Sequence, residues 1–221
     1  MGTNNKAIIS VSENSGKQRR RFSIAHELGH WELHRGRQFE CGKADIDNAA
    51  NDPLNPERQA DNYAADLLMP WYLFEPLLGQ AKKVDLQLLE HMQRTFDVSP
   101  AATAIRIAEA NVEPVIIACY GQEGRRWVSR SKDVPDRWYP VSTLDPECYA
   151  ADVVAGKRER THMSPIGADA WFDAEGIRDY EVKEQSLRLG DGTALVILRI
   201  TEEAMQSDYG RRSWPERQGR Y

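Results

Sequence analysis

The segment His26-Glu27-Leu28-Gly29-His30 decides how this chain is interpreted. Residues four apart in an α-helix lie about one turn apart on the same face. A helix would therefore present the His26 and His30 imidazoles side by side, and imidazole nitrogens are common ligands of zinc. We predict a metal site on a helix that contains this segment. The alternative is an amphipathic helix that carries two surface histidines.

Glu27 follows the first histidine directly, where its carboxylate can reach a water molecule beside the metal. A divalent ion lowers the pKa of such a water, and a carboxylate can then act as the general base. Two histidines at this spacing with this glutamate are typical of zinc proteases. We predict that the helix starts at Ile24 with Ser23 as its N-cap and stops at Gly36.

One more metal ligand must come from elsewhere, because a catalytic zinc has three protein ligands and an open position for water. Metzincins supply a histidine six residues after the second one, but that position is Gly36 here. His34 shares the helix face, yet ligands on three successive turns would span about 12 Å, too far for one ion. We interpret His34 as a structural residue or one that lines the rim of the site.

Glu57 is the better candidate for the third ligand. Residues 55–70 predict a second helix, with Asn55 as its cap and Pro56 in its first turn. Glu57 and Asp61 are four apart and share a face, as do a ligand glutamate and an aspartate in thermolysin-like zincins. The aspartate there hydrogen-bonds a ligand histidine and orients its ring. A solvated acidic helix face is the alternative interpretation.

Two blocks of sequence together resemble the ImmA/IrrE family of metallo-endopeptidases, over about residues 19 to 110. The first block is Arg20-Arg21-Phe22-Ser23-Ile24-Ala25-His26-Glu27-Leu28-Gly29-His30, followed by His34. The second block is Glu57-x-x-Ala60-Asp61-x-Tyr63-Ala64-Ala65-x-Leu67-Leu68-Met69-Pro70.

The resemblance implies a bacterial, cytoplasmic, zinc-dependent peptidase. Such peptidases cut a helix-turn-helix transcriptional repressor and so switch on a stress response or a mobile element. The resemblance also implies that His26, His30 and Glu57 hold the zinc. Glu27 would be the catalytic base, and Asp61 would hydrogen-bond a ligand histidine. The nitrogen and oxygen ligands are also compatible with manganese or another divalent ion. In the family, the residues before the first histidine build the upper lobe of the cleft. Only 25 residues precede His26 here, fewer than is usual, so the resemblance does not extend to the cleft wall expected to hold a substrate strand.

The composition is that of a soluble globular protein, with 29% charged and 41% hydrophobic residues among 221. The formal net charge of −5 gives no general attraction to nucleic acid. No segment is long and apolar enough to span a membrane, and the N-terminus lacks the layout of a signal peptide. Cys41, Cys119 and Cys148 are irregularly spaced, which indicates a reducing compartment. We therefore expect a cytoplasmic protein.

Apolar periodicity and turn residues predict an α+β fold with two domains and a tail. Residues 1–112 form a zincin-like, mainly helical peptidase domain with a short N-terminal strand at Ala7–Val11, expected to align substrate. Residues 113–202 form a small antiparallel α+β domain, which in some family members is a GAF-type sensor, and residues 203–221 form a polar tail. The remaining expected helices are Trp71–Leu78, Val84–Phe96, Ala101–Asn111 and Asp145–Ala155, and the strands are Val115–Tyr120, Arg125–Ser129, Tyr180–Leu187 and Ala194–Ile200.

Two features of the chain allow a binding function as well as a packing role. The helices within residues 85–111 have the arrangement of a helix-turn-helix unit. A helix that reads bases needs Arg, Lys, Asn or Gln on its exposed face, and Arg106 is the one such residue in 101–108. We interpret the unit as part of the peptidase core and rank direct DNA binding last. Three tryptophans could line a ligand pocket, although core packing is more common: Trp127, Trp138 and Trp171.

These observations predict an enzyme, a zinc-dependent endopeptidase that uses a metal-activated water. Tyr63 and Tyr72 are candidates for the donor that stabilises the oxyanion. The alternative is a regulatory binding protein that holds a repressor or senses a ligand, with a structural or vestigial metal site. The intact Glu27 favours the enzyme, because a structural site has no use for a base there. The expected partner is a protein, in the first place a helix-turn-helix repressor, and no membrane partner is expected.

Overall fold

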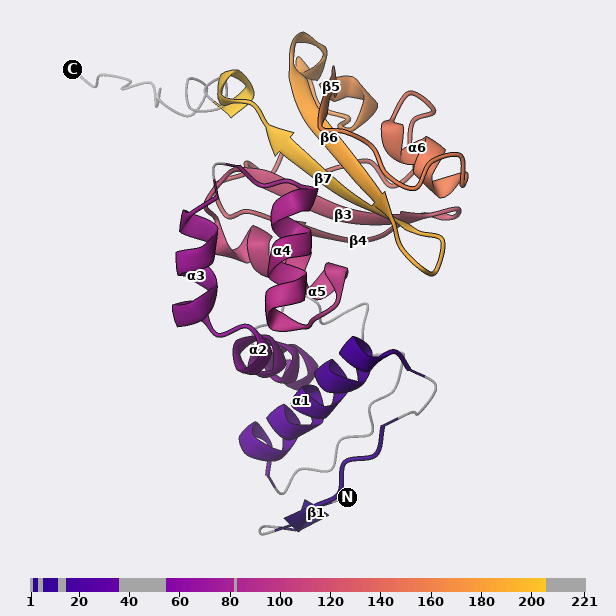
Figure 1. The fold of residues 1–221 in the computed structure, drawn as a ribbon. Coiled ribbons are helices and arrows are strands. Elements are labelled where there is room, and N and C mark those ends of the chain that lie inside the picture. Colours follow the sequence, from indigo (N-terminus) through magenta and orange to yellow (C-terminus); the bar gives the residue numbers. More distant parts are fainter. Residues whose placement is uncertain (1, 4–5, 12–14, 36–54, 82, 206–221) are drawn as a thin grey trace, which may run out of the picture. The chain divides into compact units, whose positions relative to one another are not determined.

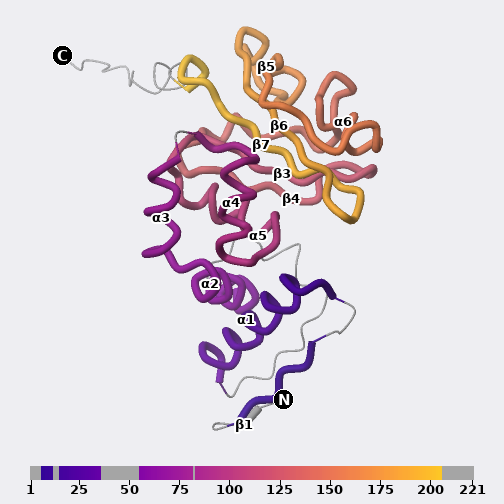
Figure 2. Tube along the Cα trace, viewed as in Figure 1, coloured from indigo at the N-terminus to yellow at the C-terminus, as the bar shows by residue number. Residues whose placement is uncertain are grey.

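The computed structural model describes residues 2–3, 6–11, 15–35, 55–81 and 83–205 (Figure 1). The chain divides into two compact units. The first comprises Met1–Gln80 and His91–Arg106, and the second comprises Ala81–Glu90 and Ile107–Tyr221. Helices dominate the first unit and the main sheet lies in the second, which confirms the predicted α+β fold; Figure 2 traces the chain through both. The domain limits at residues 112 and 202 stay a prediction.

Helix α1 spans Lys17–Leu33 and carries the two histidines of the motif. The predicted start at Ile24, with Ser23 as N-cap, is wrong, because Gly16 precedes the first helical residue. The extra turns contain straight-chain residues of high helix propensity. Asp97 holds them from outside the helix, at 2.6 Å from the Lys17 ammonium and 3.2 Å from the Arg21 guanidinium. The predicted stop at Gly36 lies outside the described residues.

Helix α2 spans Pro56–Leu68, as its cap and first-turn proline predict. The Asn55 side chain accepts a hydrogen bond from the Glu57 backbone N–H at 2.9 Å. The helix packs against α1 where Gly29 meets Ala60. A Cβ atom at Gly29 would lie 3.1 Å from the Ala60 Cα and 3.1 Å from the Tyr63 Cβ. A side chain at position 29 would therefore crowd this helix crossing.

The next three helices agree with the predictions: α3 at Trp71–Gly79, α4 at Leu86–Phe96 and α5 at Pro100–Ala110. Ser99 caps α5 by accepting a hydrogen bond from the Ala102 backbone N–H at 3.2 Å. No helix within the described ranges has both the length and the apolar character needed to cross a membrane.

Arg106, the one candidate for reading bases in α5, is 4% exposed. Its guanidinium pairs with Asp66 and donates to the Met69 carbonyl oxygen at 3.0 Å, at the end of α2. The same group stacks 3.6 Å from the centroid of the Trp71 ring. Arg106 therefore fastens α5 to the start of α3 and the end of α2, which supports the interpretation of this helix pair as a packing unit.

The second unit contains a five-stranded antiparallel sheet with strand order β4-β3-β7-β6-β5. Strand β3 pairs with β7 so that Ile117 lies opposite Ile197. Four predicted strands are confirmed, and the sequence analysis missed β5. The strands are β3 at Val115–Gly121, β4 at Gly124–Arg130, β5 at Ser164–Gly167, β6 at Glu181–Arg188 and β7 at Ala194–Ile200.

The core of this unit lies between the sheet and helix α6, Tyr149–Val154, with the short helices η1 at Ala168–Ala170 and η2 at Ile177–Asp179. Trp138 and Trp171 are fully buried in it, which confirms core packing for both. The GAF-type likeness of this part stays a prediction.

Glu184 is a carboxylate of the second unit with 0% of its surface exposed. It accepts hydrogen bonds from the backbone N–H groups of Tyr149 and Ala150, from the Trp171 indole and from the Ser186 hydroxyl. These bonds tie the start of α6 to strand β6. Burial raises the pKa of Glu184 above its ordinary value.

The N-terminal segment differs from the prediction of a strand at Ala7–Val11. Strand β2 covers Lys6–Ala7 and pairs with β1 at Gly2–Thr3, so the part of the prediction beyond Ala7 is wrong. Its proposed role in aligning substrate stays a prediction. Most of the predicted tail, from residue 206 on, lies outside the described residues.

Candidate metal centre

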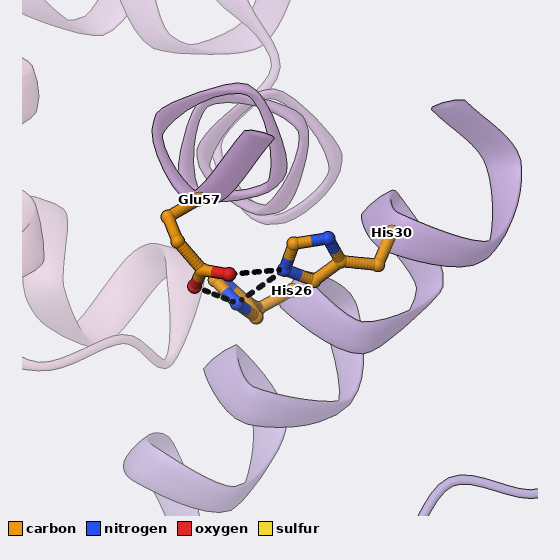
Figure 3. Close-up of side chains that lie close together, drawn as sticks. All are labelled: His26, His30 and Glu57. Carbon is orange, nitrogen blue, oxygen red and sulfur yellow. Dashed lines mark hydrogen bonds and ion pairs between the residues drawn. The ribbon is translucent and has the colours of Figure 1, made fainter. Parts of the chain in front are cut away.

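The first two helices bring His26, His30 and Glu57 together (Figure 3). The two histidine Nε2 atoms lie 3.1 Å apart. One carboxylate oxygen of Glu57 lies 3.3 Å from the His26 Nε2, and the other lies 3.3 Å from the His30 Nε2. Each of the three side chains therefore turns one donor atom toward a common point.

The donor set fits a tetrahedral zinc ion. Ligands about 2.0–2.2 Å from such an ion lie about 3.3–3.6 Å from one another. The two Nε2 atoms, 3.1 Å apart, and the two nitrogen–oxygen separations of 3.3 Å, each made by a different oxygen of Glu57, are close to this. Two imidazole nitrogens and a carboxylate are also the ligand types found in catalytic zinc sites that keep a fourth position for water. His26, His30 and Glu57 are thus the residues that would hold the cation.

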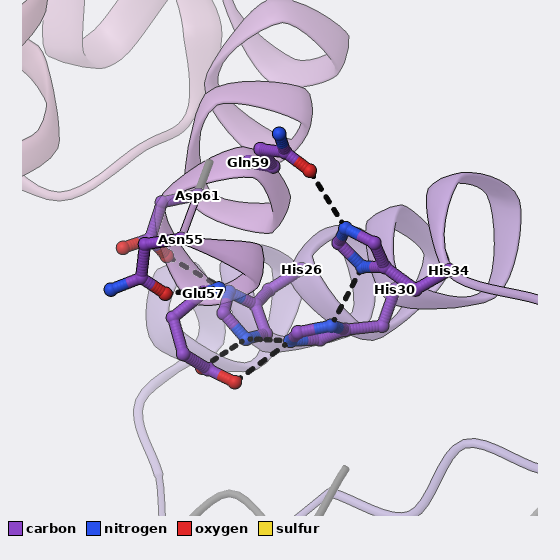
Figure 4. Close-up of polar contacts among 7 residues, drawn as sticks. All are labelled: His26, His30, His34, Asn55, Glu57, Gln59 and Asp61. Atoms are coloured by element: carbon purple, nitrogen blue, oxygen red, sulfur yellow. Dashed lines mark hydrogen bonds and ion pairs between the residues drawn. The ribbon is translucent and has the colours of Figure 1, made fainter. Parts of the chain in front are cut away.

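The outer nitrogen of each histidine has its own partner (Figure 4). The His26 Nδ1 lies 2.8 Å from the Asp61 carboxylate, which is the contact expected from the spacing of Glu57 and Asp61. The His30 Nδ1 lies 3.2 Å from the His34 Nδ1. Both rings are held from behind, so that Nε2 is the nitrogen each ring turns inward.

The two histidines differ in their affinity for protons. The hydrogen bond with Asp61 raises the pKa of His26, and burial opposes this increase. Burial is the main cause of the lowered pKa of His30, and the charge of Glu57 opposes it. A metal ligand must be neutral, so protons compete with the cation mainly at His26.

Glu27, the predicted base, is exposed on α1. Its negative charge raises the pKa of both His26 and His30, although it contributes less than the causes named above. Its carboxylate therefore lies near enough to the two histidines for its charge to act on them. Tyr72, a candidate oxyanion donor, is 76% exposed on α3, and the Tyr63 Cβ lies on the side of α2 that faces Gly29.

The sequence analysis missed one residue of this cluster, Gln59. Its side-chain oxygen lies 2.8 Å from the His34 Nε2. Gln59 is two residues from Glu57, about 200° around the helix, so it does not share the face of Glu57 and Asp61. Gln59 meets His34 because the two helices cross there, and no spacing in the sequence predicts this contact.

Comparison with known proteins relates the N-terminal part of the chain to a family of peptidases. Residues 2–108 match the family Peptidase_M78, described as the IrrE N-terminal-like domain. This match supports membership of residues 2–108 in the ImmA/IrrE peptidase family, as the two sequence blocks predict. A search of curated proteins finds no match.

A solved structure with a similar fold is described as a Mycobacterium tuberculosis transcriptional regulator. The two chains share 15% sequence identity with a TM-score of 0.54, and the alignment covers 92% of this chain and 63% of that chain. This chain therefore spans less than two thirds of the length of that regulator. At this level of identity the likeness concerns the fold alone.

Proposed function

We propose that the chain is a zinc-dependent endopeptidase whose metal ligands are His26, His30 and Glu57. The observation that carries the proposal is the meeting of two Nε2 atoms and a carboxylate at 3.1–3.3 Å. The membership of residues 2–108 in a peptidase family supports it independently. Glu27, on the same helical turn as the histidines, is proposed as the catalytic base.

The chemistry divides between the cation and the chain. Zinc, when bound, would act as a Lewis acid toward the peptide carbonyl and lower the pKa of a water molecule. Glu27 takes a proton from that water as it attacks the carbonyl carbon, and later gives the proton to the leaving amine nitrogen. Asp61 keeps the His26 ring in the orientation that directs Nε2 inward.

A helix-turn-helix transcriptional repressor is the proposed substrate. This part of the proposal rests on the family resemblance, and the fold likeness to a protein named as a transcriptional regulator is compatible with it. A repressor substrate would place the activity in the cytoplasm, where cleavage would switch on a stress response or a mobile element.

The proposal is tested with the full chain, zinc and candidate helix-turn-helix repressors from the same genome. The unchanged chain should produce a discrete repressor fragment. Glu27→Gln should keep its zinc but slow cleavage by at least about 100-fold, because the general base is lost. Glu32→Gln is a matched control, since it makes the same change at another exposed position of α1. Undiminished cleavage by Glu27→Gln would overturn the assignment.

The alternative, a regulatory binding protein with a structural or vestigial metal site, predicts a different result. The repressor would then bind without being cut, and Glu27→Gln would bind it as the unchanged chain does. The burial of Arg106 weighs against the third candidate, DNA reading by α5.

A further inference from the structure

His34 is buried beside the candidate metal centre, with 6% of its surface exposed. It follows the last residue of α1 as its C-cap. Its Nδ1 lies 3.2 Å from the His30 Nδ1, and its Nε2 lies 2.8 Å from the Gln59 Oε1 (Figure 4). The ring therefore connects a candidate ligand on α1 to an amide on α2.

With the Gln59 side-chain oxygen facing His34 and both rings neutral, the hydrogen bonds run in one direction. The side-chain oxygen of Gln59 can only accept, so the His34 Nε2 carries a hydrogen. A neutral imidazole with its hydrogen on Nε2 has a lone pair on Nδ1. The His34 Nδ1 is then the acceptor, and the His30 Nδ1 must donate to it. His30 is left with a bare Nε2, the atom that lies 3.3 Å from Glu57.

We propose that Gln59 and His34 form a positioning relay that sets the tautomer of His30 and turns its Nε2 toward the cation. This inference rests on the proposed function, because it gives His30 the role of a metal ligand. Neither relay residue touches the reacting atoms, so both are positioning residues. The relay also explains why an imidazole that cannot itself reach the ion is buried at the end of α1.

The relay differs chemically from the support of the other histidine. Asp61 reaches the His26 Nδ1 directly at 2.8 Å with a carboxylate, which is 58% exposed. His30 is instead held by a buried ring whose orientation depends on a neutral amide. The amide has a second possible orientation, in which its NH₂ group faces His34. That orientation would reverse both hydrogen bonds and place the hydrogen of His30 on Nε2.

The tautomers can be read directly in the metal-free full chain. Long-range ¹H–¹⁵N NMR spectra at about pH 8, where ordinary imidazoles are neutral, assign the protonated nitrogen of each ring. The relay predicts a hydrogen on Nδ1 of His30 and on Nε2 of His34. A hydrogen on Nε2 of His30 overturns the proposal.

Variants test whether the relay matters for metal binding. Gln59→Leu should weaken Zn²⁺ binding by about 10–100-fold, as outer partners of ligand histidines commonly do. Asn62→Leu is the matched control, because it replaces an exposed amide on the same helix and should bind as the unchanged chain does. Affinities are measured by competition with a chromophoric chelator, and Co²⁺ spectra report the geometry of the ligands. Equal Zn²⁺ affinity of the Gln59→Leu and Asn62→Leu variants overturns the proposal.

A second pair of variants separates the relay from simple packing. His34→Leu should weaken Zn²⁺ binding to the same degree as Gln59→Leu. His34→Gln should restore most of the affinity, because an amide again offers one acceptor and a donor. No difference between the two His34 variants would overturn the relay. A chain that retains Zn²⁺ but does not cut the repressor would instead overturn the peptidase proposal. The relay would still be tested by the tautomers and the Zn²⁺ affinities.

Discussion

Gly29→Ala is the substitution that most directly tests how the candidate metal centre is built. The new Cβ would lie 3.1 Å from two carbon atoms of α2, the Ala60 Cα and the Tyr63 Cβ, and 3.2 Å from the Ala60 carbonyl oxygen. Carbon atoms in normal contact are about 3.5–4.0 Å apart. The neighbouring atoms of α2 must therefore give by a few tenths of an ångström at the crossing.

This displacement should affect metal binding more than stability. Overpacking costs about 1–3 kcal/mol, but replacing glycine by alanine within a helix returns about 1 kcal/mol. The net loss in free energy of unfolding should be about 0–2 kcal/mol. Metal sites tolerate deviations of only about 0.2 Å in ligand distance. We therefore expect Gly29→Ala to weaken Zn²⁺ binding by about 10-fold or more.

The assay pairs chelator competition for Zn²⁺ with urea unfolding of the metal-free chain. Gly79→Ala is the control, because it places the same methyl group in α3 with no atom within 4 Å. That variant should bind Zn²⁺ normally and be equally or slightly more stable. If Gly29→Ala bound Zn²⁺ as tightly as Gly79→Ala, the close crossing would not control the spacing of the ligands.

Three further substitutions follow from the same structure. Asp61→Asn should weaken Zn²⁺ binding by about 10–100-fold in the same competition, because the carboxylate that holds the His26 ring is lost. Arg106→Met should lower the free energy of unfolding in urea by about 1–3 kcal/mol, because the buried Met69 carbonyl loses its donor. Glu184→Gln should remove a pH dependence of stability. Burial raises the folded-state pKa of Glu184, so the folded chain binds this proton more tightly than the unfolded chain, and stability falls as the pH rises from 4.5 toward the folded pKa. The difference in unfolding free energy between the unchanged chain and Glu184→Gln, measured across this range, isolates the effect.

Each of these predictions has a result that would contradict it. Zinc affinity unaffected by Asp61→Asn would mean that the contact with His26 does not orient the ring. A fully stable Arg106→Met variant would show that Arg106 does not fasten the helices. The difference in unfolding free energy between the unchanged chain and Glu184→Gln could instead stay constant with pH, or change in favour of the unchanged chain as the pH rises. Either result would contradict the assigned direction of the pKa shift.

Local signals in the sequence were sufficient for most helices. The limits of α2 follow from Asn55 and Pro56, and the start of α5 follows from Ser99, because caps and prolines act within one turn. The start of α1 was placed too late, because the contacts that extend it come from Asp97, far away in the sequence. Such contacts depend on the fold and leave no periodic pattern.

The same distinction applies to the sheet and to the candidate site. Strand β5 lies at the edge of the sheet and contains Pro165, a residue that normally argues against a strand. The meeting of the two histidines and Glu57 was expected from spacing on two helices. The contact of Gln59 with His34 was not, since it depends on the angle and depth at which the helices cross.

The burial of Arg106 has a consequence for the evolution of this chain. Asp66, Trp71 and Arg106 form one contact group, so substitutions at these three positions should be correlated among relatives. A relative with an apolar side chain at position 106 should also have lost the acidic group at position 66. A relative that keeps a basic residue at 106 without Asp66 and Trp71 would lack the ion pair and the ring contact that hold this charge here.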